Sequence, residues 1–338
     1  MTLTMDLGKS SYDITIERNA LSRAGEIFDL DRKVLVVTDS GVPYKYSQTL
    51  ASQCRESYVV VVEQGEINKS IVSYTYISKM LLKYGFTRTD AIVAVGGGVV
   101  TDLAGFAAST YMRGIDFYNV PTTLLSQIDA SIGGKVAIDF GGVKNIIGAF
   151  YQPKGVIIDP ELLSSLSRRQ LFNGAAEAVK MAITFDPELF TIFEQGRFLT
   201  EIDSVIEKSL IIKKRVVEED EREKGLRRVL NFGHTVGHAV ESASSGKLLH
   251  GEAVSVGMIP MCDFGIRGRV TNTLAMLGLP ISTNVEFTKA IQYIAHDKKA
   301  DGSSINVVYA TDIGSFEIRK MPVDEYIESI REVYPYKL

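Results

Sequence analysis

The chain has 338 residues, a length that corresponds to about two domains of roughly 150 residues, each large enough to bury a core. Its 37 basic side chains are balanced by 41 acidic ones, so a formal net charge of −4 gives no general basic surface and argues against nucleic acid as a partner. Apolar residues make up 45% and charged residues 23% of the chain, which excludes bulk disorder.

The N-terminal segment carries no sign of a targeting sequence. Residues 1–7 (MTLTMDL) have neither the basic nor the apolar region of a signal peptide, and no apolar run approaches the roughly 18 residues of a membrane span. Two cysteines, Cys54 and Cys262, are too few for a disulfide framework or a cysteine-based metal site. We therefore expect a cytoplasmic protein with no membrane partner.

The first half of the chain has the pattern of an α/β domain with a parallel sheet. Residues 2–7 and 12–17 flank a short turn and predict an opening hairpin. The amphipathic stretch 71–84 predicts a helix. Four β-branched runs predict strands buried on both faces, as in a Rossmann-like parallel sheet: 33–38, 58–62, 91–95 and 117–120.

The pattern changes after Asp159-Pro160, where long helical periodicities replace the strand signals. This change predicts an α/β nucleotide-binding domain at residues 1–159 and a mainly α-helical domain at residues 160–338. The charge-rich run 213–228 in the second domain is most simply a solvated helix face followed by a loop, although single charges in it could face a binding site.

Glycine is concentrated in one part of the first domain. Residues 96–155 contain eleven glycines, where even spreading predicts about five. Residues 91–102 (AIVAVGGGVVTD) predict a strand, a glycine turn and a helix start, an arrangement that directs backbone N–H groups at an anion such as a pyrophosphate. The turn lacks the usual G-x-G-x-x-G pattern, so tight packing is an equally open explanation.

Three cationic side chains follow among small residues rather than on an amphipathic helix: Arg113, Lys135 and Lys144. This setting favours binding of an anion over a solvated surface position.

Histidine is concentrated in the second domain, where three of the four histidines fall between residues 234 and 250. His234 and His238 are four residues apart on a predicted helix, so their rings share one face, and His250 opens the next helical segment. Three imidazoles suit Zn²⁺ or a similar ion. Spacing alone does not choose a further acidic ligand among Glu177, Glu241 and Glu252, and core or surface histidines are the alternative.

Seven segments, in this order, resemble the 3-dehydroquinate synthase family of NAD- and zinc-dependent sugar-phosphate cyclases. The resemblance runs from about residue 39 to residue 299. The segments are GGGVVTDLAGF (96–106), PTTLLSQ (121–127), GGK (133–135), KNIIG (144–148), EAVK (177–180), NFGHTVGH (231–238) and HGEA (250–253). One such block is weak support, but seven in order are highly specific.

The resemblance implies a phosphate-eliminating lyase of the shikimate pathway of aromatic amino acid biosynthesis, with NAD and Zn²⁺ or Co²⁺ as cofactors. Its substrate is a sugar-acid phosphate, 3-deoxy-D-arabino-heptulosonate 7-phosphate, and its products are 3-dehydroquinate and phosphate. The implied steps are transient oxidation of a hydroxyl, β-elimination of phosphate, reduction, ring opening and aldol cyclisation. A homodimer is also implied.

Carried over position by position, the resemblance implies that Glu177, His234 and His250 hold the metal, which leaves His238 to contact the substrate or transfer a proton. The positions implied around the substrate are Asp129, Lys135, Asn145, Lys180, Lys213, Arg227 and Asn231, with Arg113 from a neighbouring subunit and Lys298 or Lys299. The positions implied around NAD are Asp39, Glu66, Lys69, Gly97, Gly98, Val99, Val100, Thr101, Asp102, Thr122, Thr123, Lys135, Lys144, Leu162, Leu163, Ser164 and Ser165.

Three alternatives are kept: another sugar-phosphate cyclase, a relative of the glycerol or iron-type alcohol dehydrogenases, and a catalytically inactive NAD-binding or scaffold protein. Gly133-Gly-Lys135 favours the 3-dehydroquinate synthase family over other cyclases. The alcohol dehydrogenases have no need for Lys135, Lys144, Lys180 and Arg227 around an anionic substrate. An inactive protein is disfavoured because every implied metal and lysine position is filled.

Overall fold

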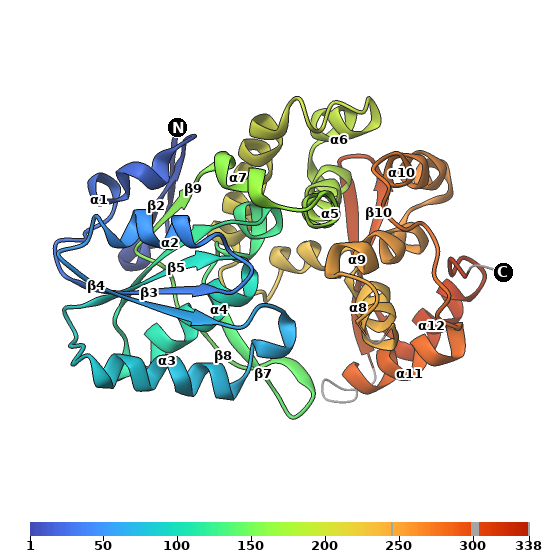
Figure 1. Cartoon of the computed structure of the whole chain (residues 1–338). Helices are drawn as coiled ribbons and strands as arrows, with labels where there is room; N and C mark the ends of the chain where they lie inside the picture. Colours follow the sequence, from blue (N-terminus) through green and yellow to red (C-terminus); the bar gives the residue numbers. More distant parts are fainter. Residues whose placement is uncertain (245, 299–303, 337–338) are drawn as a thin grey trace. The chain divides into compact units, whose positions relative to one another are not determined.

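The computed structural model describes residues 1–244, 246–298 and 304–336, with only the backbone for residues 295–298. The chain divides into two compact units, Met1–Ser167 and Arg168–Leu338 (Figure 1). This division falls later than the predicted boundary after Asp159, because the short 3-10 helix η6 (Pro160–Ser165) belongs to the first unit. Leu162 packs into the core of that unit, and the Asp159 carboxylate accepts the N–H of Asn19 at 2.9 Å.

A seven-stranded sheet forms the centre of the first unit, in the order β1-β2-β9-β6-β5-β3-β4. Strands β1 and β2 pair antiparallel, and the remaining pairs are parallel. The strands are β1 (Thr2–Met5), β2 (Tyr12–Ile16), β3 (Lys33–Asp39), β4 (Glu56–Val62), β5 (Ala91–Gly96), β6 (Asp116–Pro121) and β9 (Gly155–Ile158). The predicted hairpin and the four predicted strands are confirmed, whereas β9 is not among the predicted strands.

The central strands of this sheet are buried on both faces. Successive side chains of a strand point to opposite sides, so each strand contributes to two separate cores. Leu35 and Val37 of β3 join a core cluster with residues of α3 and α4, whereas Val34 and Val36 join a second cluster with residues of α2. The α-helices are α1 (Ala24–Ile27), α2 (Tyr44–Ala51), α3 (Ile71–Lys83) and α4 (Gly98–Thr110). The short helical turns are η1 (Gly8–Ser10), η2 (Ala20–Arg23), η3 (Glu66–Asn68), η4 (Tyr111–Arg113) and η5 (Ser126–Ala130).

A separate hairpin, β7 (Lys135–Phe140) and β8 (Val143–Phe150), is an addition to the predicted architecture. Its two-residue turn is Gly141-Gly142, both with positive φ, which is the backbone that such hairpin turns require. The pairing passes from Ile138–Ile147 directly to Phe140–Val143, so Asp139 alone faces three residues, 144–146. The hairpin therefore contains a large bulge next to its turn.

The second unit is mainly helical, as predicted. Its helices are α5 (Arg168–Phe185), α6 (Pro187–Glu194), α7 (Ile202–Glu219), η7 (Leu226–Asn231), α8 (His234–Ala243), α9 (His250–Met258), η8 (Ile259–Met261), α10 (Phe264–Met276), α11 (Phe287–Lys298) and α12 (Val323–Arg331). It also contains an antiparallel hairpin that was not predicted, β10 (Ser304–Asp312) with β11 (Ser315–Pro322). Among the described residues, no helix combines the length and apolar character that crossing a membrane requires.

Candidate active site

Helices α8 and α9 touch backbone to backbone, and this contact brings the histidines together. A Cβ atom on Gly257 of α9 would lie 2.1 Å from the carbonyl oxygen of Gly233 and 2.6 Å from the nitrogen of Gly237 in α8. Only glycine fits such an approach. His234 and His238 on α8 therefore lie beside His250, the first residue of α9.

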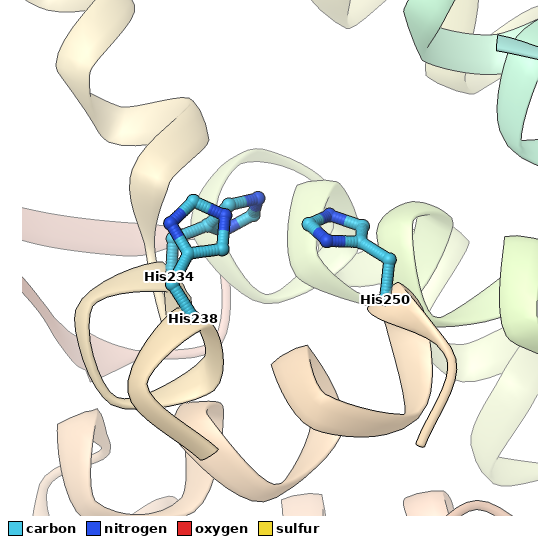
Figure 2. Close-up of side chains that lie close together, drawn as sticks. All are labelled: His234, His238 and His250. Atoms are coloured by element: carbon cyan, nitrogen blue, oxygen red, sulfur yellow. The ribbon is translucent and has the colours of Figure 1, made fainter. Parts of the chain in front are cut away.

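The three imidazoles form one cluster in which the rings are turned toward one another (Figure 2). The ring centroid of His234 lies 5.1 Å from that of His238 and 5.3 Å from that of His250, and the centroids of His238 and His250 are 5.6 Å apart. One ring nitrogen from each histidine lies within 4.8 Å of the other two. The predicted sharing of one helix face by His234 and His238 is confirmed.

A buried carboxylate completes the cluster. Glu177 on α5 is fully buried, and its Oε1 lies 3.7 Å from Nε2 of His234 and 3.5 Å from Nε2 of His250. Among the described residues, this Oε1 has no hydrogen-bond partner. An orphaned carboxylate oxygen facing two imidazole nitrogens is a donor set that fits a divalent metal ion such as Zn²⁺.

The outer nitrogens of the two imidazoles are held by other groups. Nδ1 of His234 lies 3.1 Å from the carbonyl oxygen of Phe232, and Nδ1 of His250 lies 3.2 Å from Oε2 of Glu241. Such contacts fix the ring orientation and leave Nε2 directed at Glu177. Glu241, a candidate ligand from spacing, thus contacts the outer nitrogen of His250. Its position two turns after His234 on the same helix is the one sequence feature that could have indicated this orienting contact.

Glu252, the remaining acidic candidate, has a structural role. Its carboxylate accepts two hydrogen bonds from Arg169, at 2.6 and 2.7 Å, and one from the N–H of Leu249 at 2.9 Å. The last contact caps the start of α9. Of the three acidic candidates, Glu177 is the one whose free carboxylate oxygen faces the histidines.

The pKa values of the cluster reflect competing burial and charge. Burial would raise the pKa of Glu177, but Lys180, in an ion pair with it, and the imidazoles hold this pKa well below its usual range. Burial lowers the pKa of His234 to about 3, so its imidazole is neutral. Burial would also lower the pKa of His250, yet contacts with Glu177 and Glu241 raise it to about 9.

The predicted strand, glycine turn and helix start are observed between β5 and α4. Gly97 is the N-cap of α4, and the N–H of Thr122, directly after β6, donates to the carbonyl of Gly96 at the end of β5 at 2.9 Å. A Cβ on Gly96 would lie 2.6 Å from Val100, so packing explains this glycine. A Cβ on Gly97 would lie 3.1 Å from the side chain of Thr123. Glycine at this position therefore lets the Thr123 side chain lie close to the backbone at the helix start.

A second group of predicted residues meets in the first unit. Lys69 is almost fully buried and forms an ion pair with Asp102 in the first part of α4. Its ammonium group also donates to Oδ1 of Asn145, a residue of the β7–β8 bulge. Burial would lower the pKa of Lys69, but Asp102 and other nearby carboxylates raise it above its usual value, so the ammonium stays charged.

The other predicted residues are placed as follows. Lys213 and Arg227 are buried in the second unit, whereas Asn231 is exposed and donates to Glu223 at 2.5 Å. Lys135, Lys144 and Arg113 are exposed, and Asp129 lies in η5, a π-helical turn. Leu162 and Leu163 are buried. Burial raises the pKa of Asp39. Lys299 lies outside the described residues, as does the side chain of Lys298.

Asp220, a residue missed by the sequence analysis, organises the loop that leads to Arg227. Its carboxylate accepts the backbone N–H groups of Lys224 at 2.9 Å, Gly225 at 2.6 Å and Arg227 at 3.0 Å. Burial would raise its pKa, but these three donors lower it below the usual 3.8. The stabilisation is therefore complete above about pH 4 and is lost as the pH falls through the lowered value.

We expect Asp220→Asn to lower the melting temperature at pH 7 by about 2–4 °C, which corresponds to roughly 1 kcal/mol for a unit of this size. Melts recorded from pH 7 downward should show the gap between wild type and variant narrowing below about pH 4. A gap that stays constant over this range would mean that the carboxylate charge of Asp220 does not stabilise the loop.

Fold and site together define a class of enzyme, in which an α/β unit with a glycine turn at a helix start is followed by a helical unit where a buried glutamate lies beside a cluster of three histidines. The families that match are the 3-dehydroquinate synthase N-terminal domain at residues 59–173 and the 3-dehydroquinate synthase C-terminal domain at residues 174–300. The 3-dehydroquinate synthase of Streptococcus sanguinis is 39% identical over 98% of this chain and 100% of its own length. That of Streptococcus pneumoniae is 38% identical over 96% of this chain and 98% of its own.

The chain thus belongs to the 3-dehydroquinate synthase family and is an enzyme with that family's activity. Among solved structures, the 2-epi-5-epi-valiolone synthase of Streptomyces hygroscopicus, with NAD⁺ and Zn²⁺ bound, matches with a TM-score of 0.87 and 28% identity over 96% of both chains. A 2-deoxy-scyllo-inosose synthase complexed with carbaglucose-6-phosphate, NAD⁺ and Co²⁺ shares the fold, with a TM-score of 0.84 and 24% identity over 98% of this chain and all of the other.

The alcohol dehydrogenases that the sequence left as an alternative share the fold more distantly. A probable glycerol dehydrogenase of Sinorhizobium meliloti matches with a TM-score of 0.64 and 16% identity over 95% of both chains. The two-unit architecture is therefore common to cyclases and dehydrogenases, and the family assignment depends on sequence identity over the full length.

Proposed function

We propose that the chain performs 3-dehydroquinate synthesis with NAD and one divalent metal ion, Zn²⁺ or Co²⁺, acting on 3-deoxy-D-arabino-heptulosonate 7-phosphate. The observation that carries the metal assignment is Oε1 of Glu177, which is buried without a hydrogen-bond partner in the described part of the chain and lies within 3.7 Å of two imidazole nitrogens. A relative at 28% identity has NAD⁺ and Zn²⁺ bound, which supports the same pair of cofactors here.

In this proposal Glu177, His234 and His250 hold the metal ion. When bound, NAD would supply a hydride acceptor and donor, and a divalent ion held by these three residues would supply Lewis-acid chemistry. Glu241 and the carbonyl of Phe232 keep the two imidazoles oriented, and Lys180 keeps Glu177 ionised through their buried ion pair.

The start of α4 would bind the pyrophosphate of NAD through its backbone N–H groups, with Gly97 and Gly98 allowing close approach. Lys69 and Asp102, paired at this helix, and Lys144 would contact the rest of the cofactor. The residues proposed to bind the substrate's phosphate and carboxylate are basic or amide side chains, which suit a multiply charged anion: Lys135, Asn145, Lys180, Lys213, Arg227, Asn231 and Arg113.

His238 is proposed to transfer protons at a ring nitrogen rather than to hold the metal. It is the exposed member of the histidine cluster, whereas His234 and His250 both face Glu177. We expect His238→Ala to keep its metal, measured by elemental analysis of the dialysed protein, and to lose about 10²-fold in kcat, since general acid–base catalysis typically contributes that much or more. Loss of the metal from this variant would instead make His238 a ligand.

The direct test of the proposed reaction is phosphate release from the heptulosonate phosphate by purified protein supplied with NAD⁺ and Zn²⁺. The product is then identified by NMR, because several cyclases release phosphate. Glucose 6-phosphate serves as the comparison substrate, since its carbocyclic analogue is the ligand in the 2-deoxy-scyllo-inosose synthase structure. Turnover of glucose 6-phosphate alone would assign the chain to another cyclase activity.

The relatives at 38–39% identity favour 3-dehydroquinate over the products of the cyclases at 24–28%. The proposal includes a cytoplasmic homodimer in which Arg113 serves a neighbouring subunit. Sedimentation of the purified protein tests this state, and a strictly monomeric active enzyme would contradict the role given to Arg113.

A further inference from the structure

Asp139 lies opposite the bulge of the β7–β8 hairpin and touches the residues of that bulge through its carboxylate. Three residues, 144–146, face this one residue, so the regular ladder of backbone hydrogen bonds is interrupted there. The N–H of Asn145 donates to Oδ1 of Asp139 at 2.8 Å. The side chain thus supplies an acceptor at a point where the partner strand does not follow the regular pairing.

The backbone of Asn145 needs such support. Its φ is +54°, in the left-handed region that most residues with a side chain avoid, although asparagine tolerates it better than most. In this conformation the Asn145 amide oxygen accepts from the buried ammonium group of Lys69. Without the Asp139 contact, the exposed bulge would have fewer bonds to keep Asn145 in this conformation.

The backbone of Asp139 also binds the backbone of Lys69. Its own N–H donates to the carbonyl oxygen of Lys69 at 2.8 Å, and it forms a parallel bridge with Ser70. The contacts therefore close a ring: the Lys69 backbone binds Asp139, Asp139 binds the Asn145 backbone, and the Asn145 side chain binds the Lys69 ammonium. Through Lys69 the ring reaches Asp102 at the start of α4.

We propose that Asp139 is a positioning residue, which fixes the bulge so that the Asn145 side chain is presented to the Lys69–Asp102 pair. The inference rests on the proposed function, in which these three residues bind substrate and NAD. Asp139 itself is given no contact with either ligand. Its expected effect is therefore exerted through Asn145, and this dependence can be measured.

The test compares Asp139→Ala with Asp139→Asn. The asparagine variant places an amide oxygen where the carboxylate oxygen was, so an acceptor for the Asn145 N–H is retained. We expect kcat/KM to fall about tenfold in the alanine variant and to recover mostly in the asparagine variant, because a bond to a carboxylate is replaced by a weaker bond to an amide. In an Asn145→Ala background, Asp139→Ala should cause almost no further loss of kcat/KM, since a residue that acts through Asn145 cannot lose that effect twice.

Asp13→Ala is the control: Asp13 is an exposed strand carboxylate that accepts from Thr4 at 2.7 Å.

A fluorescence titration with NADH provides a readout that needs no turnover. The dissociation constant should rise about threefold or more in Asp139→Ala, return toward wild type in Asp139→Asn, and stay unchanged in Asp13→Ala. Full additivity of the kcat/KM losses of Asp139→Ala and Asn145→Ala, or failure of Asp139→Asn to recover kcat/KM, would overturn the proposal.

If Asp139→Ala does not fold, Asp139→Ser replaces it in the same double-mutant cycle, because the serine hydroxyl is too short to replace the carboxylate. Failure of the wild-type protein to release phosphate counts against the proposed function, whereas the NADH comparison still decides the role of Asp139.

Discussion

His250→Ala is expected to fold and to lose its bound metal together with at least about a hundredfold of its activity. Two protein ligands would remain, Glu177 and His234, and two hold Zn²⁺ poorly where three normally do. A Lewis-acid contribution of several kcal/mol to the reaction would be lost with the ion. Elemental analysis after dialysis measures the metal, and circular dichroism with a thermal melt checks the fold.

The control for this prediction is His238→Ala, which removes an imidazole from the same cluster. Metal should be absent from the His250 variant and present in the His238 variant. Full metal occupancy in folded His250→Ala would remove His250 from the ligand set, and loss of metal from both variants would indicate that all three imidazoles are ligands.

Lys180→Met is expected to have the second largest effect, because it leaves a buried carboxylate without its cation. Lys180 and Glu177 are both about 1% exposed and form an ion pair. Removing one partner of such a pair costs about 3–5 kcal/mol. The loss of stability should be largest in protein treated with EDTA and smaller with saturating Zn²⁺, since a bound cation also neutralises Glu177. Thermal melts under both conditions measure this difference.

Catalysis should suffer as well, since a charge-assisted hydrogen bond to the substrate contributes about 1.5–3 kcal/mol, and kcat/KM is expected to fall at least tenfold. Lys135→Met and Lys144→Met should lose rate to a similar extent but keep their melting temperatures, because both lysines are exposed. Lys79→Met, at an exposed position of α3, is the matched control. Near-native kcat/KM in all three site variants would contradict the proposed anion-binding roles.

The strands of the central sheet could be predicted because burial on both faces requires continuous β-branched runs, as in β3 and β5. The β7–β8 hairpin has a weaker signal: its alternation is broken by the bulge, and Gly141-Gly142 is a hairpin turn that is easily assigned to a glycine-rich binding loop. The β10–β11 hairpin lies among helices, and a local pattern does not reveal that a two-stranded ribbon packs within a helical unit.

The histidine cluster could be predicted in part, because spacing on one helix places His234 and His238 together. The third imidazole depends on the crossing of α8 and α9, and the choice of Glu177 over Glu241 and Glu252 depends on which carboxylate already has a partner. Such contacts join residues distant in sequence. Spacing alone therefore left these alternatives open, and the family resemblance was needed to favour Glu177.

The glycine contact between α8 and α9 also limits how this enzyme can be made more thermostable. Replacing a helical glycine with alanine commonly adds about 0.4–1 kcal/mol by restricting the unfolded chain. At Gly257 the added methyl group would overlap the backbone of Gly233, so the same replacement would force apart the helices that carry the histidines. Helix α10 offers the permissive counterpart, because a Cβ at Gly265 or Gly268 meets no atom within 4 Å among the described residues. Stabilising substitutions of this type therefore belong on α10, where they leave the histidine cluster untouched.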